Sequence, residues 1–352
     1  MINNLTLKNF RRFKDLSLDF NSNLVILFGD NAQGKSSILE AICMISNGKS
    51  PWAQTEDMVY NKQNGNDTHM RIEITKDDES KYVFFKDNNR RQHQINGKRT
   101  TPKKFFLENS ATIFNPEQIE ILMISSSERR SFLDDVIGRT DYSYYATLKN
   151  FHKVLKQRNA YLKKLSKLFY ENGTIARNDP VLSVWTSKFV DLSSEISNRR
   201  QDMCKKLSKG DFNVKYISNI EDFSNTKDLL EKEIEKSKKR DIATGYTNTG
   251  AHREDWQIHE NQDVKKYGSR GQKRLAIGKL IFRTQEVFAQ ENGYYPTLLL
   301  DDISSELDKS NTKEILNKDL LSKQQTFITV IDTKNLPKNI VEDSQLIDLS
   351  TF

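Results

Sequence analysis

Apolar and polar residues alternate along the first thirty positions of the chain, and the period changes just afterwards. The stretches NLTLKNF and LSLDF repeat with a period of two, and NLVILFG is a continuous apolar run. We therefore expect three strands, the last of them buried in a sheet. In the following KSSILEAICMI, Ile38, Ile42 and Ile45 share one face of a helix. Three short runs between residues 70 and 98, MRIEI, YVFFK and HQINGK, predict a small antiparallel meander.

From residue 145 the hydrophobic spacing is helical over long distances. One series covers residues 148–165 with steps of three, four and seven, and a second covers residues 182–203 as a heptad seam. Because Gly173 and Pro180 separate the two series, an antiparallel helical hairpin or short arm is the economical interpretation. Two ordinary amphipathic helices packed on a globular core fit the pattern equally well.

Strand patterns return after residue 246. YYPTLLLDD contains an apolar strand that ends in two aspartates, and QTFITVID contains a further buried strand. No apolar run approaches the roughly 18 to 20 residues of a membrane span. The first residues lack the pattern of a secretory signal, and Cys43 and Cys204 have no CxxC spacing. We therefore expect a soluble, cytoplasmic protein with no membrane partner and, at 352 residues, about two domains.

Positive charge is concentrated in the helical part of the chain. Residues 149–209 contain fourteen Lys and Arg against five Asp and Glu, an excess larger than the net charge of +7 of the whole chain. Such an excess suits a polyanionic partner such as nucleic acid. A solvated Lys-rich surface is the plainer alternative.

The stretch FGDNAQGKSSILEAI satisfies the phosphate-loop pattern G-x-x-x-x-G-K-[ST], with an apolar strand before it and an amphipathic helix after it. Its glycines allow several backbone amides to face one anion, and the start of the helix adds its positive end. Lys35 is expected to reach the outer phosphates of ATP, and the Ser36 hydroxyl to bind Mg²⁺. The expected nucleotide-binding residues are Gly29, Asp30, Asn31, Ala32, Gln33, Gly34, Lys35, Ser36 and Ser37.

Two adjacent carboxylates end the apolar strand LLLDD. Asp301 is expected to orient Mg²⁺ through its water shell, and Asp302 to polarise the attacking water as a general base. Together with Lys35 they form the expected catalytic set, with Ser36 and Asp301 as the metal residues. Adjacent carboxylates at a strand end can also be a simple helix cap or turn, and the phosphate loop favours the catalytic interpretation.

Lys35 and Asp301 lie near opposite ends of the chain, so inserted material must split the nucleotide-binding core. This layout resembles that of ABC-type heads with an extension, such as the SMC class. It predicts an α/β fold: an ABC-type, SMC-head-like P-loop ATPase with mixed β-sheets, split by a mainly α-helical arm domain. We expect residues 1–124 and 246–352 to form the two parts of the ATPase domain, and residues 125–245 to form the helical insertion.

An ABC-type ATPase also needs a signature segment shortly before the second aspartate motif. YGSRGQKRLAIGKLIF supplies it, with Ser269, Gly271 and Gln272 at the start of an amphipathic helix. In ABC-type ATPases this segment faces the γ-phosphate bound by the other protomer, so ATP becomes part of a dimer interface. SSELD, residues 304–308, lies where the D-loop of such proteins would cross between protomers.

In this order the motifs resemble those of the RecF family of bacterial recombination mediator ATPases, essentially from end to end. LTLKNFRRFKDLSLDFNSNLVILFGDNAQGKSSILEAI is similar to the opening of that family. FNPEQIEILMISSSERRSFLDDVI, with Arg129 and Arg130, resembles the segment that carries its RRxFLD motif. TGAHREDW, residues 249–256, resembles TGPHRDD of the family. Ala251 and Glu254 depart from it, since the family has proline and aspartate there, and SSSERR lacks the usual glycine and proline.

The resemblance implies a weak Mg-dependent ATPase, stimulated by DNA, that acts in DNA repair, replication, recombination and the SOS response. It implies an ATP-dependent homodimer that binds double-stranded and gapped DNA at single-strand/double-strand junctions. The implied protein partners are RecR and RecO, which help to load RecA.

Two other functions fit parts of the pattern. The first is a nucleotide switch that mainly scaffolds protein partners, in which hydrolysis is incidental. The second is an ABC-type ATPase of another system, such as a defence-associated one, that does not depend on DNA.

Three features are weighed separately. His252, in GAHRED, is expected to form a structural hydrogen bond, and no histidine has the spacing of a zinc ligand. Phe10, Arg11 and Arg12 are candidates for contacts near the nucleotide or DNA, although a basic pair on the surface after a strand is the plainer interpretation. Asp332 stands where transporter ATPases have a switch histidine, so no such histidine is expected.

Overall fold

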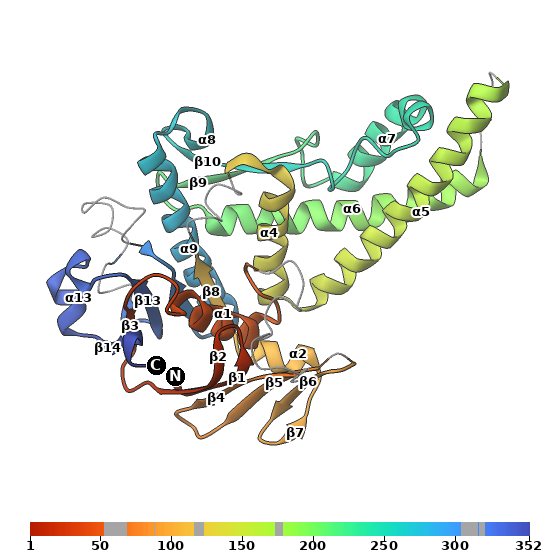
Figure 1. The fold of residues 1–352 in the computed structure, drawn as a ribbon. Coiled ribbons are helices and arrows are strands. Elements are labelled where there is room, and N and C mark those ends of the chain that lie inside the picture. Colours follow the sequence, from red (N-terminus) through yellow and green to blue (C-terminus); the bar gives the residue numbers. More distant parts are fainter. Residues whose placement is uncertain (53–68, 88, 116–122, 173–178, 304–315, 317–320) are drawn as a thin grey trace. The chain divides into compact units, whose positions relative to one another are not determined.

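The computed structural model describes residues 1–52, 69–87, 89–115, 123–172, 179–303, 316 and 321–352. It divides into two compact units, each shown in Figure 1. Unit 1 comprises Met1–Glu120 and Ser269–Phe352, and unit 2 comprises Ile121–Gly268. Unit 1, which contains the expected nucleotide-binding motifs, is thus built from both ends of the chain. Unit 2 extends further than the expected insertion, because β10 (Asp255–Glu260) pairs with β9 (Asn213–Ile217) within it.

A parallel five-stranded sheet carries the candidate motifs of unit 1. Its strands are β3 (Leu24–Phe28), β8 (Ala111–Phe114), β12 (Thr297–Leu300), β13 (Thr326–Val330) and β14 (Gln345–Asp348). The spatial order is β14-β3-β13-β12-β8, and all four pairings are parallel. The strand before the phosphate loop and the strand before the two aspartates therefore lie on either side of β13. The carboxyl ends of these strands form one edge of the sheet.

An antiparallel six-stranded sheet forms the second layer of unit 1. Its strands are β1 (Ile2–Phe10), β2 (Phe13–Asp19), β4 (Met70–Lys76), β5 (Lys81–Lys86), β6 (Arg91–Ile95) and β7 (Lys98–Arg99). They follow the order β2-β1-β4-β5-β6-β7. The predicted meander after residue 70 is confirmed as β4, β5 and β6. Short helix α2 (Pro102–Leu107) packs on β6.

Helix α1 (Lys35–Asn47) contributes to one core with strands of both sheets. Residues 38–46 of α1 are all buried, which explains why its pattern has no polar stripe in this part. Helix α9 (Arg270–Asn292) packs near β8. The remaining elements of unit 1 are η3 (Thr333–Asn335), α13 (Lys338–Glu342) and η4 (Leu349–Thr351).

Unit 2 is mainly helical and contains the predicted hairpin. Its helices are α4 (Ser126–Thr140), α5 (Ser143–Asn172), α6 (Pro180–Leu207), α7 (Thr226–Thr244) and α8 (Val264–Tyr267). A small antiparallel sheet has the order β11-β10-β9, with β11 formed by Gln262–Asp263.

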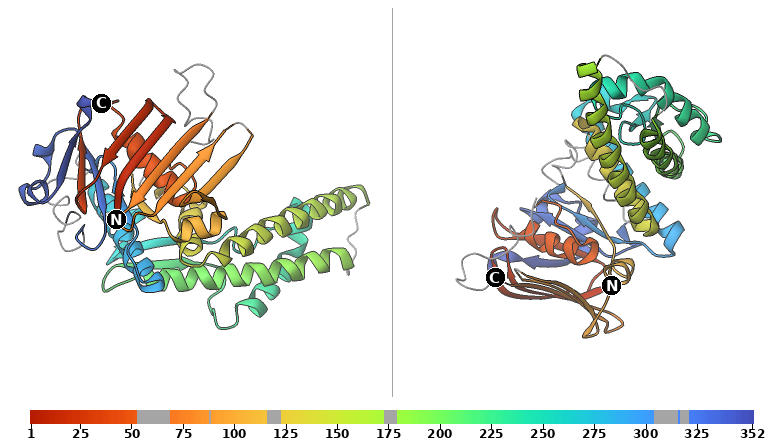
Figure 2. Two further views of the ribbon diagram at one scale, coloured as in Figure 1. Left: turned by 90° about the horizontal axis from the view of Figure 1, so that it is seen from below. Right: turned by 90° about the vertical axis from the view of Figure 1, so that its right-hand side faces the viewer.

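The two long helices of unit 2 run antiparallel, and α7 packs against both of them (Figure 2). Thr147 donates a hydrogen bond to Glu195, the ring of Phe151 contacts that of Phe189, and Leu162 packs with Leu182. Residue numbers therefore fall in α6 as they rise in α5. Along α6 the buried positions 182, 189, 196 and 203 are seven residues apart, which is the heptad seam seen in the sequence.

Candidate nucleotide-binding site

The loop between β3 and α1 has a backbone that requires glycine at its end. Gly29 has φ 138°, Gly34 has φ 95°, and Ala32 between them has φ 66°. A Cβ on Gly34 would lie 2.5 Å from Cζ of Phe13, so a larger residue does not fit without rearrangement. Gly34 is also the N-cap of α1. Backbone amides at the start of a helix suit an anion, so this loop can hold a phosphate chain.

The ammonium group of Lys35 is folded back on this loop. Its Nζ donates to the carbonyl oxygens of Gly29 at 2.6 Å and of Asp30 at 2.7 Å. Burial lowers the pKa of Lys35, and the nearby charges of Asp302 and Asp301 oppose that effect. The positive charge therefore lies beside both the loop and the aspartates.

Ser36 and Asp301 come together although they are far apart in sequence. Ser36 Oγ donates to Asp301 Oδ1 at 3.0 Å. Asp301, directly after β12, is 7% exposed, and burial raises its pKa, with repulsion from Asp302 adding to the effect. Hydrogen bonds from Thr329 and Ser36 and the charge of Lys35 act in the opposite direction.

Thr329, on β13, also contacts both aspartates and was not identified from the sequence. Its Oγ1 donates to Asp301 Oδ1 at 2.7 Å and accepts a hydrogen bond from the Asp302 backbone N at 2.8 Å. Asp302 has φ 44°, in the left-handed region. A threonine at the carboxyl end of a buried strand is common for its β-propensity alone, so the sequence carried little signal of this contact.

The oxygen atoms present suit magnesium. Ser36 and Asp301 offer a hydroxyl and a carboxylate, which are hard donors of the kind that Mg²⁺ prefers. Within the described part of the chain, no group of three or more His, Cys, Asp or Glu could hold a metal ion. A Mg²⁺ ion bound with a nucleotide usually takes its remaining ligands from phosphate oxygens and water.

The Ser269 segment forms a capping box at the start of α9. Ser269 Oγ accepts a hydrogen bond from the Gln272 backbone N at 3.3 Å, and Gln272 Oε1 accepts one from the Ser269 N at 2.8 Å. Both residues are exposed, and Gly271 lies in the first turn between them. These contacts hold the helix start rigidly at the surface. Residues 304–308, the expected D-loop, lie outside the described residues.

The basic turn between β1 and β2 contacts the phosphate loop. Arg12 Nη1 donates to the carbonyl oxygen of Ala32 at 2.6 Å. Arg11 forms a two-armed ion pair with Glu40 of α1, with Nε to Oε2 at 2.7 Å and Nη2 to Oε1 at 2.7 Å. Arg11 and Arg12 are therefore part of the packing around the phosphate loop and are not merely a solvated surface.

Asp332, at the position where transporter ATPases have a switch histidine, caps the short helix η3. Its carboxylate accepts a hydrogen bond from the Lys334 backbone N.

The RRxFLD-like segment and the TGAHREDW segment, whose roles the sequence did not explain, contact each other inside unit 2. Arg129 binds both carboxylate oxygens of Asp255, at 2.7 and 2.6 Å, and Arg130 donates to the carbonyl oxygen of Glu254. Arg200 of α6 likewise binds Asp134 with two hydrogen bonds of 2.8 Å. These buried charges are paired, as burial demands. The RRxFLD-like and TGAHREDW segments thus form one structural network.

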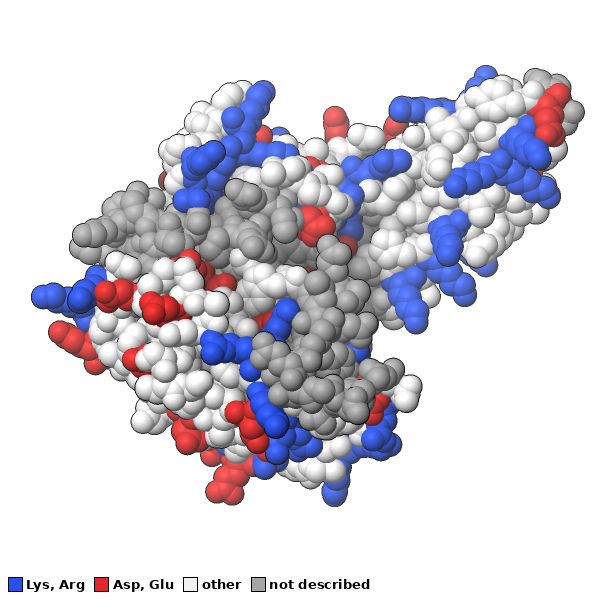
Figure 3. All heavy atoms as spheres, in the orientation of Figure 1, with Lys and Arg blue, Asp and Glu red and all other residues white. Residues whose placement is uncertain are grey.

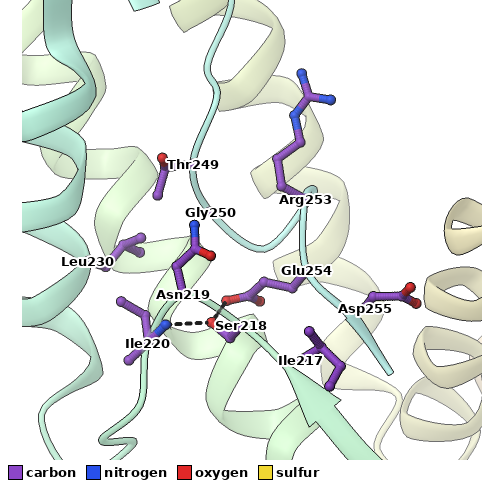
Figure 4. Close-up of a pocket in the computed structure, with 10 residues that line it drawn as sticks. All are labelled: Ile217, Ser218, Asn219, Ile220, Leu230, Thr249, Gly250, Arg253, Glu254 and Asp255. Carbon is purple, nitrogen blue, oxygen red and sulfur yellow. Dashed lines mark hydrogen bonds between the residues drawn. The ribbon is translucent and has the colours of Figure 1, made fainter. Parts of the chain in front are cut away.

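A small cavity of about 100 Å³ borders this network (Figure 4). Buried Glu254 accepts hydrogen bonds there from the hydroxyls of Ser197, Tyr216 and Ser218. Ser218 Oγ also accepts from the Ile220 backbone N at 3.0 Å. These contacts are all internal to unit 2, so the segment has a structural role that the sequence did not reveal.

His252 has the structural hydrogen bond that was expected. Its Nε2 lies 2.9 Å from the carbonyl oxygen of Thr247, and its ring packs near Phe151 and Phe189. Burial lowers the pKa of His252 to about 4. The ring is therefore neutral at pH 7 and lies in unit 2.

A lysine stripe follows the outer face of α5. Six exposed lysines share one side of the helix: five of them recur with steps of four, three, seven and four, and Lys164 lies next to Lys163 at the side of this row. Glu171 is the single acidic residue of α5, and Figure 3 shows basic side chains gathered on the long helices. The lysine stripe consists of Lys149, Lys153, Lys156, Lys163, Lys164 and Lys167.

Among the helices described, none is long and apolar enough to span a membrane.

Known proteins resemble the chain over nearly its whole length. The sequence model of the RecF/RecN/SMC N terminal domain family matches residues 1–346. The DNA replication and repair protein RecF of Clostridium kluyveri is 33% identical over 361 residues, which cover 97% of this chain and 96% of that protein. RecF of Clostridium tetani is 31% identical, again with 97% and 96% covered.

Solved structures with a similar fold include a RecF protein and an Smc head domain. The recombination mediator protein RecF bound to ATP, from the RecFOR pathway, matches with a TM-score of 0.80 and 28% identity. The match covers 96% of this chain and 93% of that one. The Smc head domain of Pyrococcus furiosus matches with a TM-score of 0.52 and 15% identity, which is a likeness of fold alone.

Proposed function

This chain belongs to the RecF family of DNA-repair ATPases, and from that premise we propose that ATP closes two copies of it, head to tail, on DNA. The observation that carries the nucleotide part is the bond of 3.0 Å between Ser36 Oγ and Asp301 Oδ1. It unites the phosphate loop with the aspartate pair at one sheet edge, as magnesium-nucleotide hydrolysis requires.

Each residue of the site has a separate task in this proposal. The amides of the loop and Lys35 bind the phosphates, with phosphate oxygens replacing the carbonyls that Lys35 now contacts. Ser36 and Asp301 hold Mg²⁺, which when bound neutralises charge on the phosphates. Asp302 orients the attacking water and accepts its proton.

A second copy completes the site. Ser269, Gly271 and Gln272 are presented at the start of α9, where a hydroxyl and backbone amides suit a γ-phosphate. The capping box keeps Ser269 and Gln272 in place in the single chain. ATP bound by one copy would then be gripped by both, and hydrolysis would reopen the pair.

DNA is the proposed polyanion. The lysine stripe presents positive charge at regular spacing, which suits phosphates and reads no base sequence. Binding is therefore expected to be independent of sequence and strongly dependent on salt. From the family we propose gapped and double-stranded DNA at single-strand/double-strand junctions as the target, RecR and RecO as partners, and support of RecA loading as the outcome.

Paired variants of the nucleotide site test this proposal. Lys35→Arg should weaken ATP binding by about ten- to a hundredfold, because it disturbs charge-assisted hydrogen bonds to phosphate. ATP-dependent dimerisation and DNA binding should fall together with it. Asp302→Asn should bind ATP normally and accumulate as a closed dimer, because only hydrolysis is lost. The measurement is the size of the protein with and without ATP, on gapped and intact duplex, across a salt series.

Three outcomes contradict the proposal or favour one of its alternatives. Dimerisation that is unaffected in Lys35→Arg would separate assembly from the nucleotide. An ATPase that ignores DNA even at low salt would favour another system, and near-zero turnover with tight ATP-dependent assembly would favour a scaffolding switch.

A further inference from the structure

One buried hydroxyl joins the two aspartates of the candidate site. Thr329 is 1% exposed, and its Oγ1 donates to Asp301 Oδ1 while it accepts from the Asp302 backbone N. A hydroxyl has one hydrogen to donate, and here the carboxylate of Asp301 receives it. The side chain of Thr329 therefore holds both the carboxylate of Asp301 and the backbone N–H of Asp302.

The position of Thr329 in the sheet fixes the direction of this hydroxyl. β13 is the strand between β3 and β12, and Thr329 is paired with Leu27 of β3, two positions before Gly29. All five residues of β13 are buried. A β-branched side chain on such a strand has little freedom at χ1. The central strand thus presents a fixed donor between the two strands that lead into the motifs.

The two bonds act on different parts of the proposed chemistry. Asp301 is also bonded by Ser36, but Ser36 is itself a proposed metal ligand, whereas Thr329 is not. Thr329 can therefore keep its bond when a cation binds. Asp302 has a left-handed backbone, which in residues other than glycine persists only when neighbours hold it. The bond to its N–H supplies such a hold.

We propose that Thr329 is a positioning residue of the ATPase site, which orients the Asp301 carboxylate for the metal and fixes the backbone of Asp302 for hydrolysis. The inference rests on the proposed function of these two aspartates. In this inference Thr329 contacts neither the nucleotide nor the metal, and it acts through Asp301 and Asp302.

Three variants of similar size test this role. Thr329→Val removes the hydroxyl at nearly constant volume, and Thr329→Ser keeps it. Thr326→Val is the matched control, because Thr326 is a buried threonine on the same strand whose hydroxyl accepts from Gln324. Mn²⁺ binding, in the presence of a non-hydrolysable ATP analogue, is measured by electron paramagnetic resonance. Melting temperature, kcat and KM are measured on the same variants.

Thr329→Val should weaken Mn²⁺ binding by about ten- to a hundredfold, the range of a lost hydrogen bond to a charged group. It should lower kcat while the KM for ATP stays within about twofold. Thr329→Ser and Thr326→Val should resemble the wild type in all of these measurements.

Mn²⁺ affinity and kcat that are unchanged in Thr329→Val overturn the inference. So does an equal loss in Thr326→Val, which would make the effect one of packing, or a failure of Thr329→Ser to restore the wild-type values. Failure of the proposed function is a separate result: it would appear as no nucleotide-dependent Mn²⁺ binding in the wild type itself.

Discussion

Two residues other than glycine hold a left-handed backbone at the candidate site, Ala32 with φ 66° and Asp302 with φ 44°. Such conformations cost about 1 to 3 kcal/mol each and persist where the surroundings hold them. Arg12 donates to the carbonyl oxygen of Ala32, and Thr329 accepts from the N–H of Asp302. In both cases the supporting side chain comes from another element, so local sequence gives no sign of it.

Acid sensitivity can be predicted for one buried residue, His252. Its pKa is lowered to about 4 in the folded protein, against 6.5 ordinarily, so the unfolded chain binds the proton more tightly between these values. The contribution of the neutral His252 ring to the free energy of unfolding is therefore present above about pH 6.5 and is lost as the pH falls toward 4. In His252→Gln, the free energy of unfolding, measured with denaturant, should depend less steeply on pH across this range. The slope should decrease by the equivalent of at most one bound proton.

The pH range above neutrality is the internal control for His252. Between pH 8 and 9 the ring is neutral in both states, so the stabilities of variant and wild type should change with pH in parallel. An unchanged slope between pH 4 and 6.5 in the variant would show that other groups cause the acid sensitivity.

At the scale of elements, periodicity revealed the strongly patterned segments and missed others, among them the long helices α4 and α7 and two short strands. β3, α1, β12 and the hairpin were predicted because long or continuous apolar patterns mark them. β8, with the sequence ATIF, and β14, with QLID, were not assigned. Each has four residues and lies at an edge of the parallel sheet, where its pairing partner is remote in sequence. Thr329 was missed for a related reason, because a threonine in a strand looks like ordinary β-sheet composition.

The lysine stripe predicts a measurable effect on DNA binding. The triple variant Lys153→Gln, Lys156→Gln, Lys164→Gln should reduce the slope of log affinity against log salt by about 3, one for each phosphate contact removed. Affinity at low salt should fall for all DNA sequences alike. Fluorescence anisotropy with a labelled gapped duplex across a salt series measures both quantities.

Helix α7 offers a matched control for the lysine stripe. Lys232, Lys236 and Lys239 are also exposed. Lys232 and Lys236 stand beside glutamates in the sequence, and Lys236 pairs with Glu233 at 2.6 Å. The triple variant Lys232→Gln, Lys236→Gln, Lys239→Gln removes the same charge. Equal losses from the two triple variants would mean that net charge matters and that the stripe has no special role.

At the scale of the whole molecule, the sequence indicated a core built from both chain ends but not the extent of the helical unit. Residues 246–268 belong to unit 2 because partners on three helices hold them. Arg129 binds Asp255, Arg158 donates to Thr247, and Arg200 donates to the carbonyl oxygen of Ala251. These pairs join residues that are 51 to 126 positions apart, so no local pattern could show them.

Assembly of two copies is tested at the signature segment. Ser269→Arg should bind ATP with wild-type affinity but fail to dimerise, because a bulky cation would stand where the γ-phosphate of the second copy must approach. Analytical ultracentrifugation with ATP measures dimerisation, and a fluorescent nucleotide measures binding. The composite-site proposal fails if this variant dimerises normally.

Gln290→Arg is the control for assembly, since it places the same side chain at an exposed position near the other end of α9. It should dimerise as the wild type does. Loss of the Ser269 cap itself costs about 1 kcal/mol of helix stability, so a melting curve separates unfolding from failed assembly.

The antiparallel register of α5 and α6 restricts how the length of this hairpin can change in evolution. Residues 147, 151 and 162 of one helix face 195, 189 and 182 of the other, and buried positions of α6 recur every seven residues. An insertion in one helix alone would turn every later contact away from its partner. Relatives with longer or shorter hairpins are therefore expected to differ by paired insertions or deletions of about seven residues, one in each helix.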